Sequence, residues 1–144
     1  MEIPFDLWYA PDYPLDKIRV STKVYREDFE KWRPALAQNI SEWGLVNPLI
    51  VLNHRSGKYN DNWLKIGNNR YWALRYLGWS TAPVLITGYS DYGTKVTLEE
   101  AKALFMDGEL YYDERTDGGT LRIRNFSDPS KFEFPNDRPI HYGN

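Results

Sequence analysis

The sequence predicts a small α+β protein, in which a mixed β-sheet packs against helices and a C-terminal extension adds one helix and a β-hairpin. A continuous apolar run of strand length at 48–52 indicates a strand covered on both faces, and residues 82–86 indicate a further apolar strand. Apolar residues at helical spacing precede the first run and place Leu36, Ile40 and Trp43 on one face. A length of 144 residues suits one ordinary core.

The N-terminal part is predicted to contain an arm, a strand and a helix in two pieces. Residues 1–12, rich in Pro, Asp and aromatic residues, indicate an irregular arm, and the alternation over 15–20 indicates a short strand. A first helical turn is expected over 27–32. Pro34 suits the first position of the main helix, because its missing N–H would have no partner there. Gly44 favours a left-handed helix end.

The middle of the chain alternates strands with a helix. Turn residues at 53–57 follow the first apolar run, and a strand is expected over 62–66. The next helix is expected over 68–77, with Gly78 as its terminator, and it leads into the second apolar run.

Residues 91–144 are assigned to an extension that packs on the same core as the main domain of residues 1–90. Thr97 and Glu100 form a capping box, in which each side chain satisfies an N–H of the other residue, so a helix is expected from there to about Met106. A hairpin is predicted around Asp117-Gly118-Gly119, with Leu121 and Ile123 on one face of its second strand and Arg122 and Arg124 on the other.

The composition narrows the function classes. No apolar run approaches the ~20 residues of a membrane helix, and the start lacks a secretory signal, so no membrane partner and a cytoplasmic location are expected. The absence of cysteine excludes disulfides, thiolate metal sites and cysteine nucleophiles. A net charge of -2 argues against general coating of duplex DNA, although a local basic patch is compatible with it. The aromatic content of 16% favours a core enlarged by rings over rings that stack on bases.

The turn Gly67-Asn68-Asn69-Arg70 joins a predicted strand to a predicted helix. The N–H groups of a first helical turn and the helix dipole attract anions, Gly67 permits close backbone approach, and Arg70 can hold phosphate oxygens. On spacing alone, the alternative is favoured: Gly67 is a turn residue, one Asn caps the helix and Arg70 is a solvated charge.

Three motifs in order give residues 15–86 a resemblance to the N-terminal domain shared by ParB partition proteins and sulfiredoxins. Residues 39–48 are similar to the pattern Ser-Ile-x-x-x-Gly-Leu-x-x-Pro, and residues 67–73 are similar to the ParB box Gly-Glu-Arg-Arg-x-Arg-Ala. A Pro-Val-x-Ile strand follows at 83–86. The resemblance covers about half the chain and implies a ParB/sulfiredoxin-like sheet.

The resemblance implies that the turn holds nucleotide phosphates, as in ParB proteins that bind and hydrolyse CTP. Gly67, Arg70 and Ala73 match the box residue by residue. Asn69 and Trp72 replace two box arginines, which weakens the case for a tightly held triphosphate. The essential cysteine of sulfiredoxins falls at Asn68, so sulfinic-acid reduction by that mechanism is not available.

The residues after Ile86 are too few for the helix-turn-helix and dimerisation domains of a partition protein, so centromere clamping is not expected. The resemblance instead points to free-standing members of the superfamily, which include nucleases and a kinase that phosphorylates free serine. Short forms of this kind often belong to phages and mobile elements.

Chemistry on a phosphate ester would require a carboxylate, acting as a base or holding Mg²⁺, and a second cation. Glu30 and Arg26 are the expected catalytic residues, and Mg²⁺ bound with a nucleotide is the expected cofactor. Glu27 and Asp28 are assigned to the helix start, where negative charge complements the dipole. No protein metal site is predicted from the two histidines.

Two hypotheses of different classes follow. In the first, the chain binds a nucleotide or a nucleic-acid backbone at residues 67–70 and acts as a nuclease, a nucleotide hydrolase or a small-molecule kinase. In the second, the domain is catalytically inactive and acts as a binding module or adaptor on DNA or on a host protein. The missing box arginines favour the second hypothesis, and the retained Gly-x-x-Arg turn favours the first. The oligomeric state stays open.

Overall fold

The computed structural model describes residues 3–20, 34–53, 62–115 and 119–125. Their elements are β1 (Leu7–Pro14), the 3-10 helix η1 (Leu15–Lys17), α2 (Pro34–Trp43), β2 (Leu49–Asn53), β3 (Trp63–Ile66), α3 (Asn68–Tyr76), β4 (Thr81–Gly88), β5 (Thr94–Val96), α4 (Leu98–Lys102), β6 (Glu109–Asp113) and β7 (Thr120–Arg124). Among these helices, none is long and apolar enough to cross a membrane.

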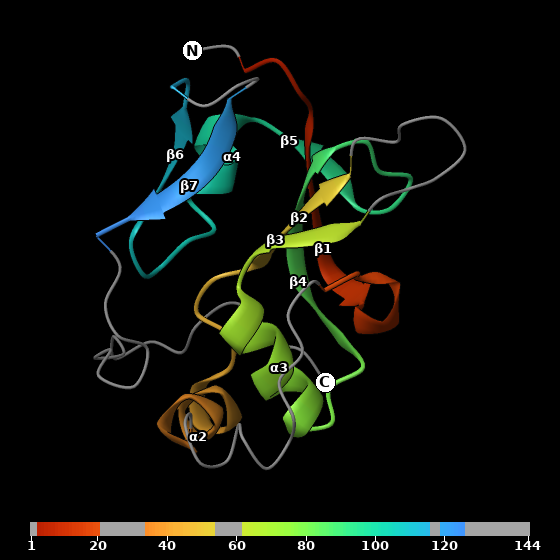
Figure 1. The fold of residues 1–144 in the computed structure, drawn as a ribbon, viewed down its shortest axis with the longest axis vertical. Helices are drawn as coiled ribbons and strands as arrows, with labels where there is room; N and C mark the ends of the chain where they lie inside the picture. Colours follow the sequence, from red (N-terminus) through yellow and green to blue (C-terminus); the bar gives the residue numbers. More distant parts are fainter. Residues whose placement is uncertain (1–2, 21–33, 54–61, 116–118, 126–144) are drawn as a thin grey trace.

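A five-stranded mixed sheet has the strand order β3-β2-β4-β1-β5, and β6 and β7 form a separate two-stranded sheet (Figure 1). β2 and β4 run parallel at the centre, in register from Leu49↔Val84 to Asn53↔Gly88, and β1 lies antiparallel to both β4 and β5. Both predicted apolar runs are central strands and are buried along almost their whole length. The predicted α+β class is confirmed.

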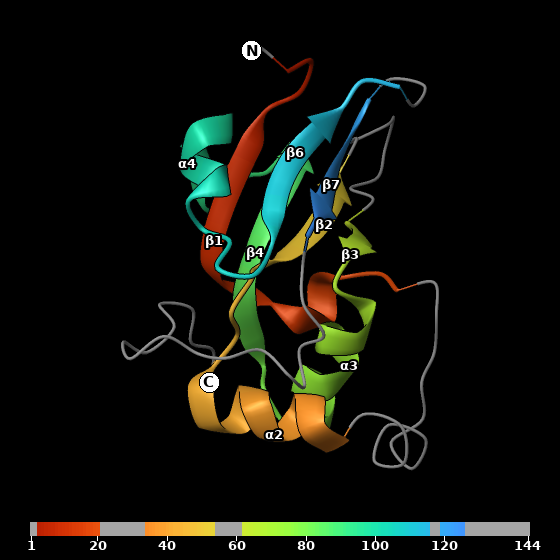
Figure 2. The same cartoon turned by 90° about the vertical axis from the view of Figure 1, so that its left-hand side faces the viewer.

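The alternation of side chains along β2 divides the apolar core into two clusters. Leu49 and Val51 belong to the cluster that contains buried residues of α2 and α3. Ile50 and Leu85 belong to the cluster that contains α4 and the β6–β7 hairpin. Successive side chains of a strand point to opposite faces, so the extension covers the sheet face opposite α2 and α3. Figures 1 and 2 show α2 and α3 toward one end of the molecule and α4 with the hairpin toward the other. The assigned division at residue 90 stays a prediction.

The capping box at the start of α4 is confirmed. The Thr97 hydroxyl accepts a hydrogen bond from the Glu100 N–H at 3.1 Å, and the Glu100 carboxylate accepts one from the Thr97 N–H at 2.9 Å. The helix ends at Lys102, however, rather than at Met106. The Leu104 and Phe105 N–H groups donate to carbonyls only three residues back, which ends the α-helical ladder. The Met106 N–H then donates to the Asn47 side chain at 2.9 Å.

The N-terminal prediction is wrong in two places. Leu7–Pro14, expected to be irregular, forms β1, and residues 15–20 form η1 and an isolated bridge between Arg19 and Trp63 instead of a strand. The register of β1 shifts between Ala10 and Tyr13, where Pro11 lies. A bulge tolerates proline because the extra residues leave the hydrogen-bond ladder. β5 was also missed, and the expected helical turn at 27–32 lies outside the described residues.

The predicted hairpin is present as β6 and β7, although residues 116–118 of its turn are outside the described part. Leu121 is buried, and Arg122 and Arg124 are exposed, as the alternation predicts. The buried Asp113 carboxylate accepts hydrogen bonds from the side chains of Arg115 and Arg122, at 3.0 Å from each Nε. The hydrogen bonds from the side chain and backbone N–H of Arg115, with the positive charges of Arg115 and Arg122, lower the pKa of Asp113 to about 2.

Two glycines bound α3 and offer a matched test of packing. Gly67 has φ 107°, and a Cβ there would lie 2.7 Å from Leu49 Cδ2, whereas Gly78 has φ 82° and open space around the same position. Gly78→Ala should cost about 1 to 2 kcal/mol for the left-handed backbone alone. We expect Gly67→Ala to lower the free energy of unfolding further, as measured by urea denaturation, because Leu49 must also move. Equal losses would show that the Leu49 contact has no energetic weight.

Asp113 gives a pH-dependent test of the hairpin. A carboxylate whose folded pKa lies below its unfolded pKa stabilises the folded state above the unfolded value, and this stability is lost as the pH falls through the folded value. The free-energy difference between wild type and Asp113→Asn should therefore shrink between about pH 4 and pH 2. Glu114→Gln, at an exposed neighbouring position, is the control. A difference that is constant over this range would contradict the role of the arginines.

Candidate phosphate-binding turn

The start of α3 presents an uncapped helix N-terminus. Gly67 is the N-cap in a left-handed conformation, it supplies no side-chain cap, and the first turn has no acidic residue. The Tyr71 N–H makes the first helical hydrogen bond, to the Gly67 carbonyl at 2.7 Å. The N–H groups of residues 68–70 thus lie ahead of the ladder, where a helix has donors without partners inside the helix. In α4, by contrast, Thr97 caps the first turn and acidic residues complement the dipole.

The predicted phosphate-binding residues differ in how exposed their side chains are. Asn69 is exposed at the second position of α3 and is accessible to a ligand. The backbone of Asn68 opens the helix, but its side chain is outside the described part. Ala73, the third match to the ParB box, is fully buried in the core, so its role here is packing.

Arg70 is buried, with 9% of its surface exposed, and does not lie on the surface where it could bind a phosphate directly. Its Nη2 atom lies 4.0 Å from Asp107 Oδ2, which is beyond hydrogen-bond distance, and this nitrogen donates to no acceptor among the described residues. Burial lowers the pKa of the Arg70 guanidinium, and the nearby Asp107 carboxylate partly offsets this effect. A guanidinium remains charged in proteins, so a buried positive charge lies at the third position of α3.

Asp107 was not among the predicted site residues. Its backbone is held in place near Arg70 by hydrogen bonds to the side chain of the fully buried Asn47. The Asn47 Oδ1 atom accepts from the N–H groups of Met106 and Asp107, at 2.9 and 3.0 Å, and its Nδ2 donates to the Asp107 carbonyl at 2.7 Å. One amide thus satisfies three backbone groups that lie about 60 residues away along the chain. The only signal in the sequence was a polar residue next to an apolar strand, in the segment before Pro48.

The remaining predicted site residues lie outside the described part of the chain. They are the expected catalytic residues Glu30 and Arg26, with Glu27, Asp28 and both histidines. Within the described ranges, no group of three or more metal-binding side chains is found. The chemistry that the described turn offers is therefore anion binding: first-turn N–H groups, an exposed amide at Asn69 and a buried cation, with the Asp107 carboxylate as an internal competitor.

The charges of Arg70 and Asp107 are expected to depend on each other. Arg70→Met removes the positive charge opposite the buried Asp107 carboxylate, and breaking a buried pair in this way costs about 3 to 5 kcal/mol of folding free energy. Asp107→Asn leaves the guanidinium buried alone. We expect the double variant to lose less stability than the sum of the single variants, as measured by urea denaturation. Strictly additive losses would show that the two charges do not interact.

Comparison with curated proteins finds a partial similarity to the nucleoid occlusion protein of Halalkalibacterium halodurans, with 37% identity over 59 residues. The aligned segment covers 41% of this chain and 19% of that protein, so the match spans about a fifth of the relative's length. No protein-family model and no solved structure matches the chain. Since nucleoid occlusion proteins of this kind are ParB-family members, the match gives distant support to a ParB-like relationship.

Proposed function

We propose that this chain is a ParB-like phosphate-binding protein that holds a nucleotide, or the backbone of a nucleic acid, at the start of α3. The observation that carries the proposal is the uncapped N-terminus of α3 with the charged Arg70 in its first turn. The helix dipole favours a negatively charged ligand at this position, and the first turn of α3 contains no acidic side chain that would occupy the same place. The partial similarity to a nucleoid occlusion protein supports a DNA-related role.

The geometry suggests a division of labour within the turn. The first-turn N–H groups and the exposed Asn69 would donate hydrogen bonds to phosphate oxygens. Arg70 would act mainly through its charge, because its burial strengthens electrostatic interactions while keeping the guanidinium from gripping a ligand on the surface. One buried cation, partly balanced by Asp107, suits a phosphodiester or a monophosphate better than a triphosphate.

Catalysis at the turn would need groups beyond those that bind the phosphate. A nuclease, a nucleotide hydrolase or a kinase would require Mg²⁺ and a base near the phosphate. Glu30 and Arg26 remain the proposed catalytic pair. Asp107 is the carboxylate that the described structure brings near the turn. Its position opposite Arg70 suits charge balance and not the role of a base.

A second candidate is an inactive binding module acting on DNA or on a host protein. The observation that favours it is that Asp107 already opposes the charge of Arg70, so the cation that would hold a phosphate is used inside the protein. The two candidates differ in whether any phosphate ligand binds at residues 67–70.

Asn69→Asp is the sharpest test of the proposed site. The substitution keeps the side-chain shape and adds a negative charge at the second position of α3, where it favours the helix but repels a phosphate. We expect nucleotide or DNA affinity to fall by about tenfold, equivalent to about 1.4 kcal/mol. Isothermal titration with the four ribonucleoside triphosphates, their monophosphates and short DNA, with and without Mg²⁺, measures this.

Arg75→Gln is the matched control, because it changes the net charge by the same amount near the other end of α3. Its guanidinium is partly exposed and pairs with Asp16 at 2.8 Å, so the loss should leave phosphate affinity nearly unchanged. Equal losses in both variants would indicate general electrostatics without a defined site. If no nucleotide or DNA binds the wild type, the phosphate proposal fails and the binding module becomes the favoured function. Cleavage of supercoiled DNA or release of phosphate, tested in the same samples, decides the enzyme hypothesis.

A further inference from the structure

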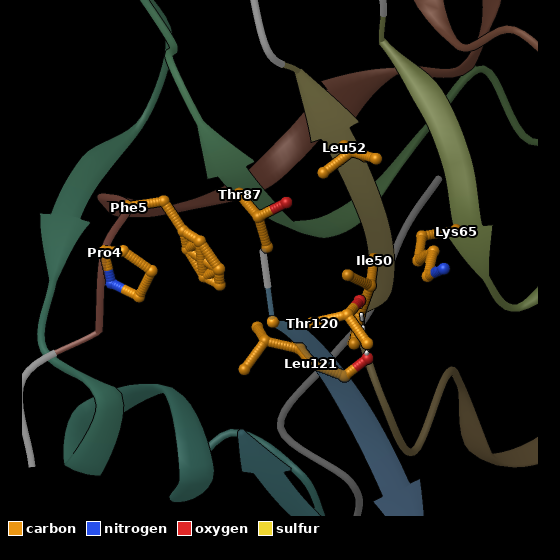
Figure 3. A pocket seen from close by; sticks show the side chains of 9 residues that line it. Pro4, Phe5, Ile50, Leu52, Lys65, Thr87, Thr120 and Leu121 are labelled. Atoms are coloured by element: carbon orange, nitrogen blue, oxygen red, sulfur yellow. Dashed lines mark hydrogen bonds between the residues drawn. The ribbon is translucent and has the colours of Figure 1, made fainter. Parts of the chain in front are cut away.

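A small cavity lies between the central sheet and the β6–β7 hairpin, on the sheet face opposite α2 and α3 (Figure 3). Its volume is about 190 Å³. This equals about six water molecules at their liquid volume of about 30 Å³ each. Pockets for drug-sized ligands are larger, at about 300 to 1,000 Å³. The cavity therefore suits a compact ligand with few heavy atoms.

The walls of the cavity are mainly apolar. Ile50 from β2 and Leu121 from β7 form its buried base, while Phe5 and Leu52 add partly exposed apolar surface (Figure 3). Phe5 makes an edge-to-face contact with Tyr112, with centroids 5.8 Å apart, so its ring is positioned by the hairpin. An apolar ligand body would gain contact with at least three side chains.

Two threonine hydroxyls interrupt the apolar wall. Thr87, from β4, is buried, with 3% of its surface exposed, and its hydroxyl contacts the Val51 carbonyl at 3.5 Å. The hydroxyl of Thr120 contacts the Leu121 carbonyl, also at 3.5 Å. Both distances exceed the usual O–H···O range of about 2.5 to 3.0 Å, so both hydroxyls retain capacity for a stronger acceptor.

Lys65 supplies the only charge among the residues that line this cavity, all of them in the described part of the chain. It lies on β3, beyond Ile50 in Figure 3, and it is exposed. It makes no ion pair with a described residue, whereas Lys95 pairs with Asp6 at 3.3 Å and Lys102 with Glu99 at 3.5 Å. A cation that no described carboxylate neutralises, beside an apolar cavity, is complementary to an anion that carries an apolar body.

We propose that this cavity binds a small monocarboxylate with an aromatic or branched aliphatic body. The body would lie against Pro4, Phe5 and Leu52, and the carboxylate would accept hydrogen bonds from Lys65 and the Thr120 hydroxyl. This site is separate in chemistry from the phosphate-binding turn, which offers donors to a polar anion but no apolar cavity.

Benzoate, benzyl alcohol and inorganic phosphate separate the parts of the proposal. Benzyl alcohol keeps the ring and lacks the charge, and phosphate keeps the charge and lacks the ring. Titrated into ¹⁵N-labelled full-length protein and followed by NMR, benzoate should bind with an affinity in about the millimolar range, because a ligand of this size has few atoms with which to gain binding energy. Its shift changes should centre on Ile50, Thr87 and Leu121. Benzyl alcohol should bind more weakly, and phosphate should leave these signals unchanged.

Lys65→Gln should lower the affinity for benzoate about tenfold and the affinity for benzyl alcohol little. Only benzoate carries the negative charge that makes a charge-assisted hydrogen bond with Lys65. Lys95→Gln, the same change on the opposite edge strand, should leave both affinities unchanged. Asn69→Asp should also leave benzoate binding unchanged, which separates this site from the turn.

Three results would overturn the proposal. They are the absence of benzoate binding, equal affinity for benzoate and benzyl alcohol in both the wild type and Lys65→Gln, and loss of benzoate binding in Asn69→Asp. The first two results leave nucleotide binding at the turn untouched, and the third would assign benzoate to the turn instead of the cavity, so the two proposals can fail independently.

Discussion

The three hydrogen bonds of the Asn47 side chain connect parts of the chain that no strand pairing joins. This fully buried amide lies just before β2 and satisfies the backbone of residues 106 and 107, in the connection between α4 and β6. Leaving such backbone groups buried without partners would be costly. The bonds fix the connection between α4 and β6 and hold Asp107 in the buried position from which it opposes Arg70 of α3. The electrostatics of the turn at the start of α3 therefore depend on this contact.

The charge pair beside α3 affects both the stability of the fold and the binding proposed at the turn. A buried guanidinium costs desolvation energy that a carboxylate 4.0 Å away only partly returns. The same separation keeps the two groups from forming a direct hydrogen bond, so the positive potential at the helix start is reduced but not cancelled. A phosphate at the turn would add to the negative charge near Arg70 and would compete with Asp107. This electrostatic balance would decide whether a phosphate can bind at the proposed site.

One short strand serves both faces of the sheet. Leu49 and Val51 of β2 support the helices on one side, where Leu49 also leaves no room for a side chain at Gly67. Ile50 and Leu52 line the cavity on the other side. Because a register slip of one residue would exchange these sets, the parallel pairing of β2 with β4 determines both sites at once.

The sequence by itself determined what local physics controls. Apolar runs placed β2 and β4, the Thr97–Glu100 spacing placed the cap of α4, and the strand, glycine and helix around Gly67 placed the turn. Only the tertiary structure decided that Leu7–Pro14 is a strand, since its pairing with two strands and the bulge at Pro11 outweigh its irregular composition. The sequence likewise did not determine three further features. They are the burial of Arg70, the position of Asp107 near it and the cavity beside Lys65. Side-chain spacing reports contacts a few residues apart, whereas these features arise from residues far apart in sequence that the packed core brings together.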